Sequence, residues 1–351
     1  MGKLAVYKYI SLMLLVITTM TATFTLFGLF GGTVDPATGT AMAMLVYILP
    51  FLLGLNIILL FYWAIRRKWH WMAIPAVTLL CSIHYIGSVY QPSFFHHSET
   101  NRSGIKVSTY NVAKFSRETS GFKSQDILSE MKRQNVDILC IQEYEDIRGD
   151  KLNSTSYKTY FPHMATGRND MVIYSRYPIE RHDIIDFGKT NNSAMWADIN
   201  VNSRIVRVFN CHLETTGFNR VLHQLGKEQA LGRSIEDNAL IRTFYGNYTR
   251  GMAIRARQAD MVAELIKGSQ YPVIVCGDFN DVPYSYVYKT MLGDLVDGFR
   301  EGGEGIMYTY SGKKRVRIDY IFHDEKFQSE SYYIKELTYS DHYPVFSKIA
   351  F

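Results

Sequence analysis

Long, almost uncharged apolar runs dominate the first ninety residues of the chain. Asp35 is the only charged side chain between Tyr9 and Ile65, and there is none between Trp71 and Tyr90. A bilayer core about 30 Å thick is crossed by roughly 20 apolar residues in a helix. The pattern therefore predicts a membrane anchor at residues 1–90 with three transmembrane helices, over about 9–30, 41–65 and 71–90.

The cations around these runs are distributed unevenly. Lys3 and Lys8 precede the first run, Arg66–Lys68 separate the second from the third, and no cation lies between the first and the second. Short loops rich in Lys and Arg stay on the cytoplasmic side. We therefore expect an integral protein of the plasma or inner membrane with a cytoplasmic N-terminus and, after three crossings, an extracytoplasmic remainder. A cleaved signal peptide is the alternative for the first run, which is long for one and lacks a small-x-small cleavage pattern.

From residue 105 the pattern changes to short apolar runs that alternate with helical periodicities. Residues 91–104 are polar and are expected to link the anchor to a domain at 105–351. Helices are expected at 124–134, around 220–244 and at 252–268, with 213–251 as an insertion. Strands outnumber helices, and no glycine-rich loop follows the first strand, which excludes Rossmann and P-loop folds. The pattern favours an α+β domain of packed sheets with helices outside, and its strands are expected at 105–110, 136–142, 170–175, 193–199, 205–212, 271–276, 316–322 and 344–351.

Composition and charge are consistent with this division. The chain of 351 residues is 47% hydrophobic and 20% charged, which excludes a largely disordered protein. Residues 1–90 contain five cations and one anion, so most of the net charge of +5 lies there and the remainder carries +1. A domain that holds long DNA usually has a more basic surface, although a local basic patch stays compatible. The four cysteines form no CxxC pair, so we expect neither a zinc motif nor a disulfide framework, but small buried side chains.

Several predicted strands end in a polar side chain that the fold alone does not require. Individually, each is explained as a turn former or a surface group. Together they are carboxylates, amides and histidines without a thiolate, a set that suits Mg²⁺, Mn²⁺ or Ca²⁺ better than structural zinc. Groups held at the ends of rigid strands are typical of a preorganised site. The set is Asn111, Glu143, His212, Asp278, Asn280, Asp319, Asp341 and His342.

The motifs around these residues resemble those of the endonuclease/exonuclease/phosphatase family, in the family's chain order, over about residues 105–351. The resemblance implies a four-layer α/β/β/α sandwich, as in DNase-like proteins, with the site at one end. Ala113 stands where abasic-site endonucleases carry an aspartate and His212 where they use a tyrosine, so the chain is more similar to the sphingomyelinase and DNase branches. The motifs are Tyr110-Asn111, Gln142-Glu143, Asn210-x-His212-Leu213, Gly277-Asp278-Phe279-Asn280, Arg317-Ile318-Asp319-Tyr320 and Ser340-Asp341-His342.

The resemblance also implies the chemistry, which is hydrolysis of phosphate esters with Mg²⁺ as the cofactor and Mn²⁺ as a possible substitute. It implies that Glu143 is the principal metal ligand, with Asn111 beside it and Asp341 contributing. It gives Asp278 and Asn280 the positioning of water and phosphate. His342 would contact the phosphate or act as the base, and Asp319 would fix its tautomer. His212 would contact the phosphate from the other side or help to protonate the leaving group.

The sequence leaves the substrate open between nucleic acid and a phospholipid or other phosphate ester. Two other functions compete with hydrolysis: a membrane-tethered binding module that keeps the fold without the chemistry, and a membrane sensor. The expected partner of the helices is the lipid bilayer, and no protein partner is evident. Arg315 and Arg317 precede Asp319 and are interpreted either as phosphate contacts or as solvated arginines at a strand edge, whereas Arg255 and Arg257 are interpreted as exposed or structural.

Overall fold

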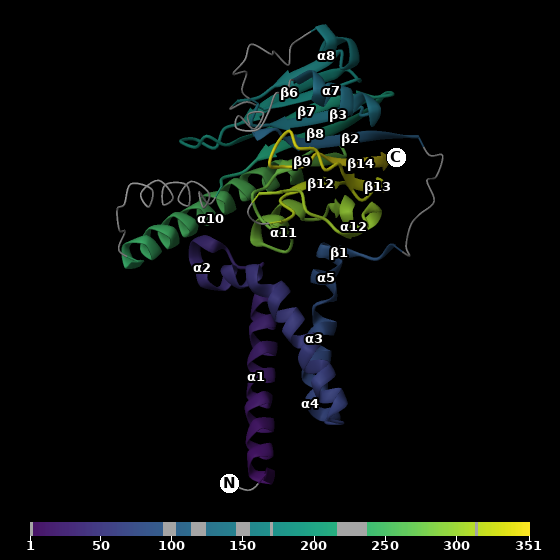
Figure 1. Cartoon of the computed structure of the whole chain (residues 1–351). Coiled ribbons are helices and arrows are strands. Elements are labelled where there is room, and N and C mark those ends of the chain that lie inside the picture. Colours follow the sequence, from purple (N-terminus) through teal and green to yellow (C-terminus); the bar gives the residue numbers. More distant parts are fainter. Residues whose placement is uncertain are drawn as a thin grey trace.

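The computed structural model describes residues 3–93, 103–113, 124–144, 155–168, 171–215, 237–312 and 315–351. Figure 1 shows a bundle of long helices, with the N-terminus at its far end, below a domain of sheets and shorter helices. Most of the expected linker 91–104 lies outside the described residues. The same holds for residues 216–236 of the expected insertion at 213–251, which include the first part of the helix expected around 220–244.

Two stretches of the helical part are long and apolar enough to cross a membrane, Val6–Gly31 and Pro36–Ile65. The third expected crossing is a pair of helices, Trp69–Cys81 and Ile83–Val89, bent by 53°. The Ser82 hydroxyl at the bend donates to Thr78 O at 2.8 Å, a bond that bends helices. The elements are α1 (Lys3–Gly31), α2 (Pro36–Met44), the 3₁₀ helix η1 (Leu45–Ile48), α3 (Leu49–Ile65), α4 (Trp69–Cys81) and α5 (Ile83–Val89).

A polar seam joins α1 to α3 inside this bundle. Asn56 Nδ2 donates to Thr25 Oγ1 and Trp63 Nε1 donates to Thr18 Oγ1, both at 2.9 Å. Interhelical hydrogen bonds of this kind hold helices together where lipid offers no hydrophobic gain. Cys81 is exposed on α4, so the expectation that it is buried is wrong: an apolar run on the outside of such a bundle has the same sequence pattern as a buried one.

Two six-stranded sheets form the second part of the chain. Within them, β2 pairs with β3 and β8 pairs with β9 in parallel, and the other neighbours are antiparallel. The first sheet has the order β13 (Gln328–Ile334), β14 (Val345–Ala350), β2 (Gly104–Asn111), β3 (Ile138–Gln142), β5 (Val172–Ser175) and β4 (His163–Thr166). The second has the order β10 (Val296–Asp297), β12 (Asp319–His323), β9 (Val273–Asp278), β8 (Arg204–His212), β7 (Ser193–Val201) and β6 (Ile179–Ile185).

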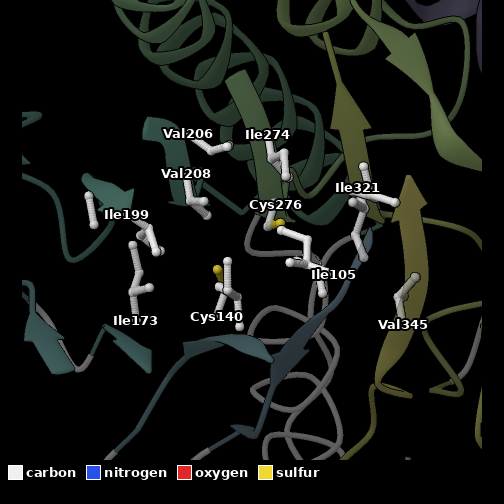
Figure 2. Close-up of a cluster of buried hydrophobic side chains, with 14 of the residues drawn as sticks. Ile105, Cys140, Ile173, Ile199, Val206, Val208, Ile274, Cys276, Ile321 and Val345 are labelled. Atoms are coloured by element: carbon white, nitrogen blue, oxygen red, sulfur yellow. The ribbon is translucent and has the colours of Figure 1, made fainter. Parts of the chain in front are cut away.

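The sheets pack face to face over one apolar core. Figure 2 shows Ile105 and Cys140 of the first sheet opposite Val208, Ile274 and Cys276 of the second. Inward and outward side chains alternate along a strand, so each sheet has a second apolar face. Helices α7 (Ser124–Arg133) and α8 (Thr155–Tyr160) cover that face of the first sheet, and α10 (Asp237–Lys267) and α11 (Tyr286–Leu292) cover that of the second. The four-layer sandwich is therefore confirmed, as is the burial of Cys140, Cys211 and Cys276.

Some elements differ from the sequence-based expectations. The helix expected at 252–268 is the second half of α10, which begins at Asp237 and so includes residues 237–251 of the expected insertion. The strand expected at 316–322 begins only at Asp319. Strand β6 was not expected because residues 180–184 of this edge strand are all exposed, which removes the alternation that marks a half-buried strand. Strands β4 and β13 and the helix α12 (Gly298–Gly302) were not expected either.

The helical bundle contacts the sandwich directly. Strand β1 (Tyr90–Gln91), which follows α5, pairs with β11 (Gly305–Ile306). Lys289 Nζ on α11 donates to Leu29 O in the last turn of α1 at 3.2 Å, where the carbonyls of a helix end favour a cation. Burial lowers the pKa of Lys289 to about 8. The anchor is therefore packed against the domain at several points.

Candidate active site

Parallel strand pairs bring the predicted site residues to one edge of the sandwich. In the first sheet Asn111, the last residue of β2, pairs with Gln142, the last residue of β3. In the second, His212 at the end of β8 pairs with Asp278 at the end of β9, and Asp278 also pairs with Asp319 of β12. Because parallel strands end on the same side, each sheet contributes its polar residues at one place.

Asn111 connects the two sheets at this edge. Its Nδ2 donates to Glu143 Oε1 at 3.1 Å and to Asp278 Oδ2 at 3.0 Å. Its Oδ1 accepts from the backbone N of Ala113 at 2.9 Å. The buried amide of Asn111 thus holds two carboxylates together through its nitrogen.

His342 lies between two carboxylates. Its Nδ1 is 2.9 Å from Asp319 Oδ2, and its Nε2 is 3.8 Å from Asp278 Oδ2. Burial lowers the pKa of this imidazole, but the negative charges of Asp319 and Asp278 outweigh burial and raise the pKa to about 10. In the metal-free site these charges therefore favour the imidazolium form of His342, and Asp319 fixes the orientation of its ring.

Asp278 is the most crowded carboxylate of the site. Burial and the charge of Asp319 raise its pKa to about 6, against the opposite effect of His342 and His212. Its Oδ1 accepts from the backbone N of Asn280 at 2.8 Å. A carboxyl group with a pKa in this range exchanges its proton near physiological pH, which is what a general base requires.

His212 and Asn280 complete the cluster. His212 Nε2 lies 3.4 Å from Glu143 Oε1 and 4.0 Å from Asp278 Oδ2. Asn280 Nδ2 donates to Leu213 O at 2.9 Å and lies 3.3 Å from Asp278 Oδ2. The site thus has two histidines, one from each sheet. His212 is the last residue of β8 in the second sheet, and His342 precedes β14 of the first.

The donors of this cluster fit a hard divalent cation. Asp278, Asp319 and His342 offer ligand atoms that all lie within 4.8 Å of one another, and Glu143 joins them through Asn111. Oxygen-rich sets of this kind suit Mg²⁺ or Mn²⁺. Asp341 joins no hydrogen-bond network with the others through its side chain: its Oδ1 is buried without a hydrogen-bond partner within the described part of the chain. The structure brings seven of the eight predicted residues together. The eighth, Asp341, directly precedes His342 in the sequence.

Two buried amides beneath the site were not predicted as functional. Gln142 Nε2 donates to Asn210 Oδ1 and to Thr109 Oγ1. Asn210 Nδ2 donates across the core to Ile141 O at 3.0 Å. Both amides are fully buried, so they tie the two sheets together directly below Asn111 and Asp278. The signal that points to them is a polar residue inside an apolar strand, since buried polar groups need partners.

The backbone of the site contains strained positions. Glu143 and Asn280 have φ values of 53° and 52°, a left-handed conformation that costs energy for a residue with a Cβ atom and that clusters at functional sites. Gly277 has φ 138°, and a Cβ atom there would lie 1.9 Å from Cys211 O. Only glycine fits at this close approach of β9 to β8.

Two of the four arginines near the site, Arg255 and Arg317, are structural. Arg317 is buried, and its Nη2 is 2.7 Å from Asp297 Oδ2, so both interpretations of it, a phosphate contact and a solvated strand-edge arginine, are wrong. Arg315 is exposed. Arg255 is buried against Asp281 at 3.1 Å, which confirms a structural role for it, whereas Arg257 is exposed.

Comparisons with known proteins agree with this geometry. The sequence profile of the endonuclease/exonuclease/phosphatase family matches residues 108–342, and that of a domain family of unknown function matches residues 11–89. No curated protein matches the chain.

Solved structures resemble the sandwich at low sequence identity, which shows the fold alone. An endonuclease/exonuclease/phosphatase from Beutenbergia cavernae has 18% identity and a TM-score of 0.52, with 71% of this chain and 72% of that chain covered. One from Bacteroides vulgatus has 16% identity and a TM-score of 0.50, with 71% and 99% covered. D. rerio TDP2, complexed with a single-strand DNA product, has 15% identity and a TM-score of 0.51, with 71% and 100% covered.

Proposed function

Because the chain belongs to the endonuclease/exonuclease/phosphatase family, we propose that it is a membrane-anchored phosphoesterase that requires a divalent metal, Mg²⁺ or Mn²⁺. The single observation that carries this proposal is the contact of Asn111 with both Glu143 and Asp278, which joins carboxylates from two sheets. A non-catalytic module has no need for the buried carboxylate of Asp278 beside a second carboxylate, Glu143, on a strained backbone, since such an arrangement costs stability.

Glu143 and Asp341 are the residues that would hold the metal, with Asn111 beside Glu143 and with Oδ1 of Asp341 buried and without a hydrogen-bond partner among the residues that the structure describes. When bound, a divalent cation neutralises the phosphoryl oxygens of the ester and makes a water molecule a better nucleophile. Asn111 keeps Glu143 and Asp278 in place through its Nδ2. The raised pKa of Asp278 is consistent with a cation bound nearby, because a cation relieves the crowding of negative charge.

Asp278 is the proposed general base, and His342 the proposed phosphate contact. Of the two roles left open for His342, the geometry favours contact with the phosphate over the role of base, because an imidazolium between two carboxylates has no free nitrogen to accept a proton. Asp278, with its pKa of about 6, accepts the proton of the attacking water. His212, beside Glu143, is the proposed donor to the leaving oxygen.

We assign the catalytic domain to the extracytoplasmic side. The helices α1, α3 and the α4–α5 pair run side by side in Figure 1, and the N-terminus lies at the end of the bundle away from the sandwich. Three crossings, with the bent pair as the third, would put the cationic segments Lys3–Lys8 and Arg66–Lys68 on the same side. By the rule that such segments stay inside, the sandwich is outside.

A phosphate ester of the bilayer is the proposed substrate class. The loop that follows Asp278 contacts the anchor, since Tyr47 donates to Asp281 Oδ1 at 2.8 Å, and this keeps the site close to the membrane. Nucleic acid is the second candidate, because D. rerio TDP2 has the same fold and was solved with a single-strand DNA product.

The test uses the full-length chain in nanodiscs, because the anchor packs against the domain. Sphingomyelin and phosphatidylcholine in the disc, plasmid DNA, and a chromogenic phosphodiester are incubated with Mg²⁺ or with EDTA. We expect metal-dependent turnover of a lipid, lost in Asp278→Asn and kept in Asp183→Asn, an exposed aspartate on β6. Turnover of DNA alone would move the substrate to nucleic acid, and no turnover of any ester would overturn the proposed enzyme.

A further inference from the structure

The loop between β9 and α11 has two functions in the structure. It begins directly after Asp278, the last residue of β9, and contains Asn280 of the candidate active site. At its end it packs on the anchor, where Val282 and Tyr284 contact the apolar cluster formed by Val46, Leu49, Leu53 and Tyr85. The ring of Tyr284 lies edge-on to that of Tyr85, with the centroids 5.6 Å apart. A segment of seven residues thus spans from the catalytic carboxylate to the membrane helices.

A buried polar chain runs through the middle of this loop. Tyr47 Oη, in the 3₁₀ helix η1 of the anchor, donates to Asp281 Oδ1 at 2.8 Å. Asp281 Oδ2 accepts from Arg255 Nε at 3.1 Å, and Arg255 Nη1 donates to Glu214 O at 2.8 Å. Glu214 is two residues after His212. This hydrogen-bond network therefore links the anchor to the segments that follow both Asp278 and His212.

The residues of this hydrogen-bond network are buried, so the loss of any one of its hydrogen bonds is costly. Asp281 is 4% exposed and Arg255 is 1% exposed. A buried carboxylate needs its full set of donors, because an unfilled acceptor position is not compensated by water. Tyr47 and Arg255 are side-chain donors to Asp281. The backbone N of Val282 is a further donor, at 2.9 Å.

The backbone of the loop depends on such support. Asn280 and Tyr284, one residue before and three residues after Asp281, both have positive φ, 52° and 72°. Conformations of this kind persist only where the surroundings hold them. On the anchor side Gly32 allows the close approach, since a Cβ atom there would lie 2.0 Å from Tyr284 O.

We infer that Tyr47 is a positioning residue for catalysis and that the membrane anchor, through the Tyr47–Asp281 hydrogen bond, holds the loop that follows Asp278 and carries Asn280. This inference rests on the proposed hydrolase function. The anchor then does more than keep the enzyme at the bilayer: its 3₁₀ segment is part of the scaffold of the active site. Tyr47 acts only through Asp281 and touches neither the substrate nor the metal.

The test compares Tyr47→Phe with Tyr62→Phe in the full-length protein in nanodiscs. Tyr47→Phe removes one hydroxyl and keeps the ring, which packs edge-on against Tyr248. Tyr62 is the matched control, since it lies on α3 against Trp63. We expect kcat to fall roughly 10- to 100-fold in Tyr47→Phe, as for a small misplacement of catalytic groups, with KM within about twofold. The control keeps the wild-type kcat. A wild-type kcat in Tyr47→Phe would overturn the inference.

Amide hydrogen exchange provides a readout that does not depend on turnover. We expect faster exchange at residues 278–285 in Tyr47→Phe, with unchanged exchange in β7, which pairs with β6 and β8 in the second sheet. Uniformly faster exchange over the whole sandwich would identify a general loss of stability and overturn the positioning role. Should the wild type hydrolyse no phosphate ester, the proposed function fails, whereas the exchange data still decide whether Tyr47 holds the loop.

Discussion

Replacing Asp319 by Asn is the sharpest perturbation of the proposed chemistry. The substitution keeps the size of the side chain and an acceptor for His342 Nδ1, but it removes the negative charge that lies 2.9 Å away. At an effective dielectric constant of about 20, a pair of unit charges at that distance interacts with about 6 kcal/mol. This corresponds to about four pKa units, which is enough to cancel the rise of the His342 pKa to about 10. In Asp319→Asn, His342 is therefore neutral at pH 7.5.

The assay is the pH dependence of kcat/KM for the full-length protein and for Asp319→Asn, from pH 5 to pH 9 with saturating Mg²⁺. If the imidazolium of His342 contacts the phosphate, kcat/KM of the variant falls by up to about 10⁴-fold at neutral pH, the loss found when the carboxylate behind the histidine of a serine-protease triad is replaced. The deficit should narrow below pH 6, where the imidazole regains its proton.

A constant ratio of the two rates over the whole pH range would refute this reasoning. It would mean that Asp319 acts on the site without setting the charge of His342. A variant as active as the wild type at all pH values would remove both Asp319 and His342 from the proposed mechanism.

Two further predictions concern stability. The pKa of Asp278 is raised from 3.8 to about 6, so the folded, metal-free protein keeps a proton that the unfolded chain releases; stability therefore falls as the pH rises through this window. Melting temperatures measured in EDTA from about pH 4 to about pH 7 should fall less steeply with pH in Asp278→Asn than in the wild type. An identical dependence on pH in both proteins would contradict the raised pKa of Asp278. Arg317→Met leaves the buried Asp297 without its cationic partner, although Tyr288 Oη and Phe299 N still donate to it, and should cost about 3–5 kcal/mol. An unchanged denaturant midpoint would show that the ion pair contributes nothing.

The sequence predicts the sandwich well because its strands are buried and bounded by polar residues. Strands such as β8 and β9 have apolar runs that end at His212 and Asp278, so both the element and its functional end are visible in the pattern. The edge strand β6 is exposed over residues 180–184 and was missed for that reason. The continuous helix α10 was divided because Gly246 and Gly251, which disfavour a helix interior, lie between the two expected helices.

The sequence indicated the candidate site residues because their chemistry is unusual at strand ends, but it did not predict their hydrogen-bond partners. Asn111 donates through its nitrogen to Glu143, 32 residues away in the chain, and to Asp278, 167 residues away. These contacts depend on how the strands pair and how the two sheets pack, which no local pattern shows. Arg317 was misread because nothing local shows that Asp297 and Ser88 O are its partners. Contacts between the anchor and the domain, such as Tyr47 with Asp281, are likewise invisible in a linear pattern.

The most direct test of the account is the number and affinity of divalent ions bound by the site. Titration of the full-length protein with Mn²⁺, followed by electron paramagnetic resonance, should reveal a site for which Asp278→Asn and Glu143→Gln each raise the dissociation constant at least about tenfold. Asp183→Asn should bind as the wild type does. Loss of affinity in both site variants is the predicted result; wild-type Mn²⁺ binding in both would show that the carboxylates gathered by Asn111 hold no metal.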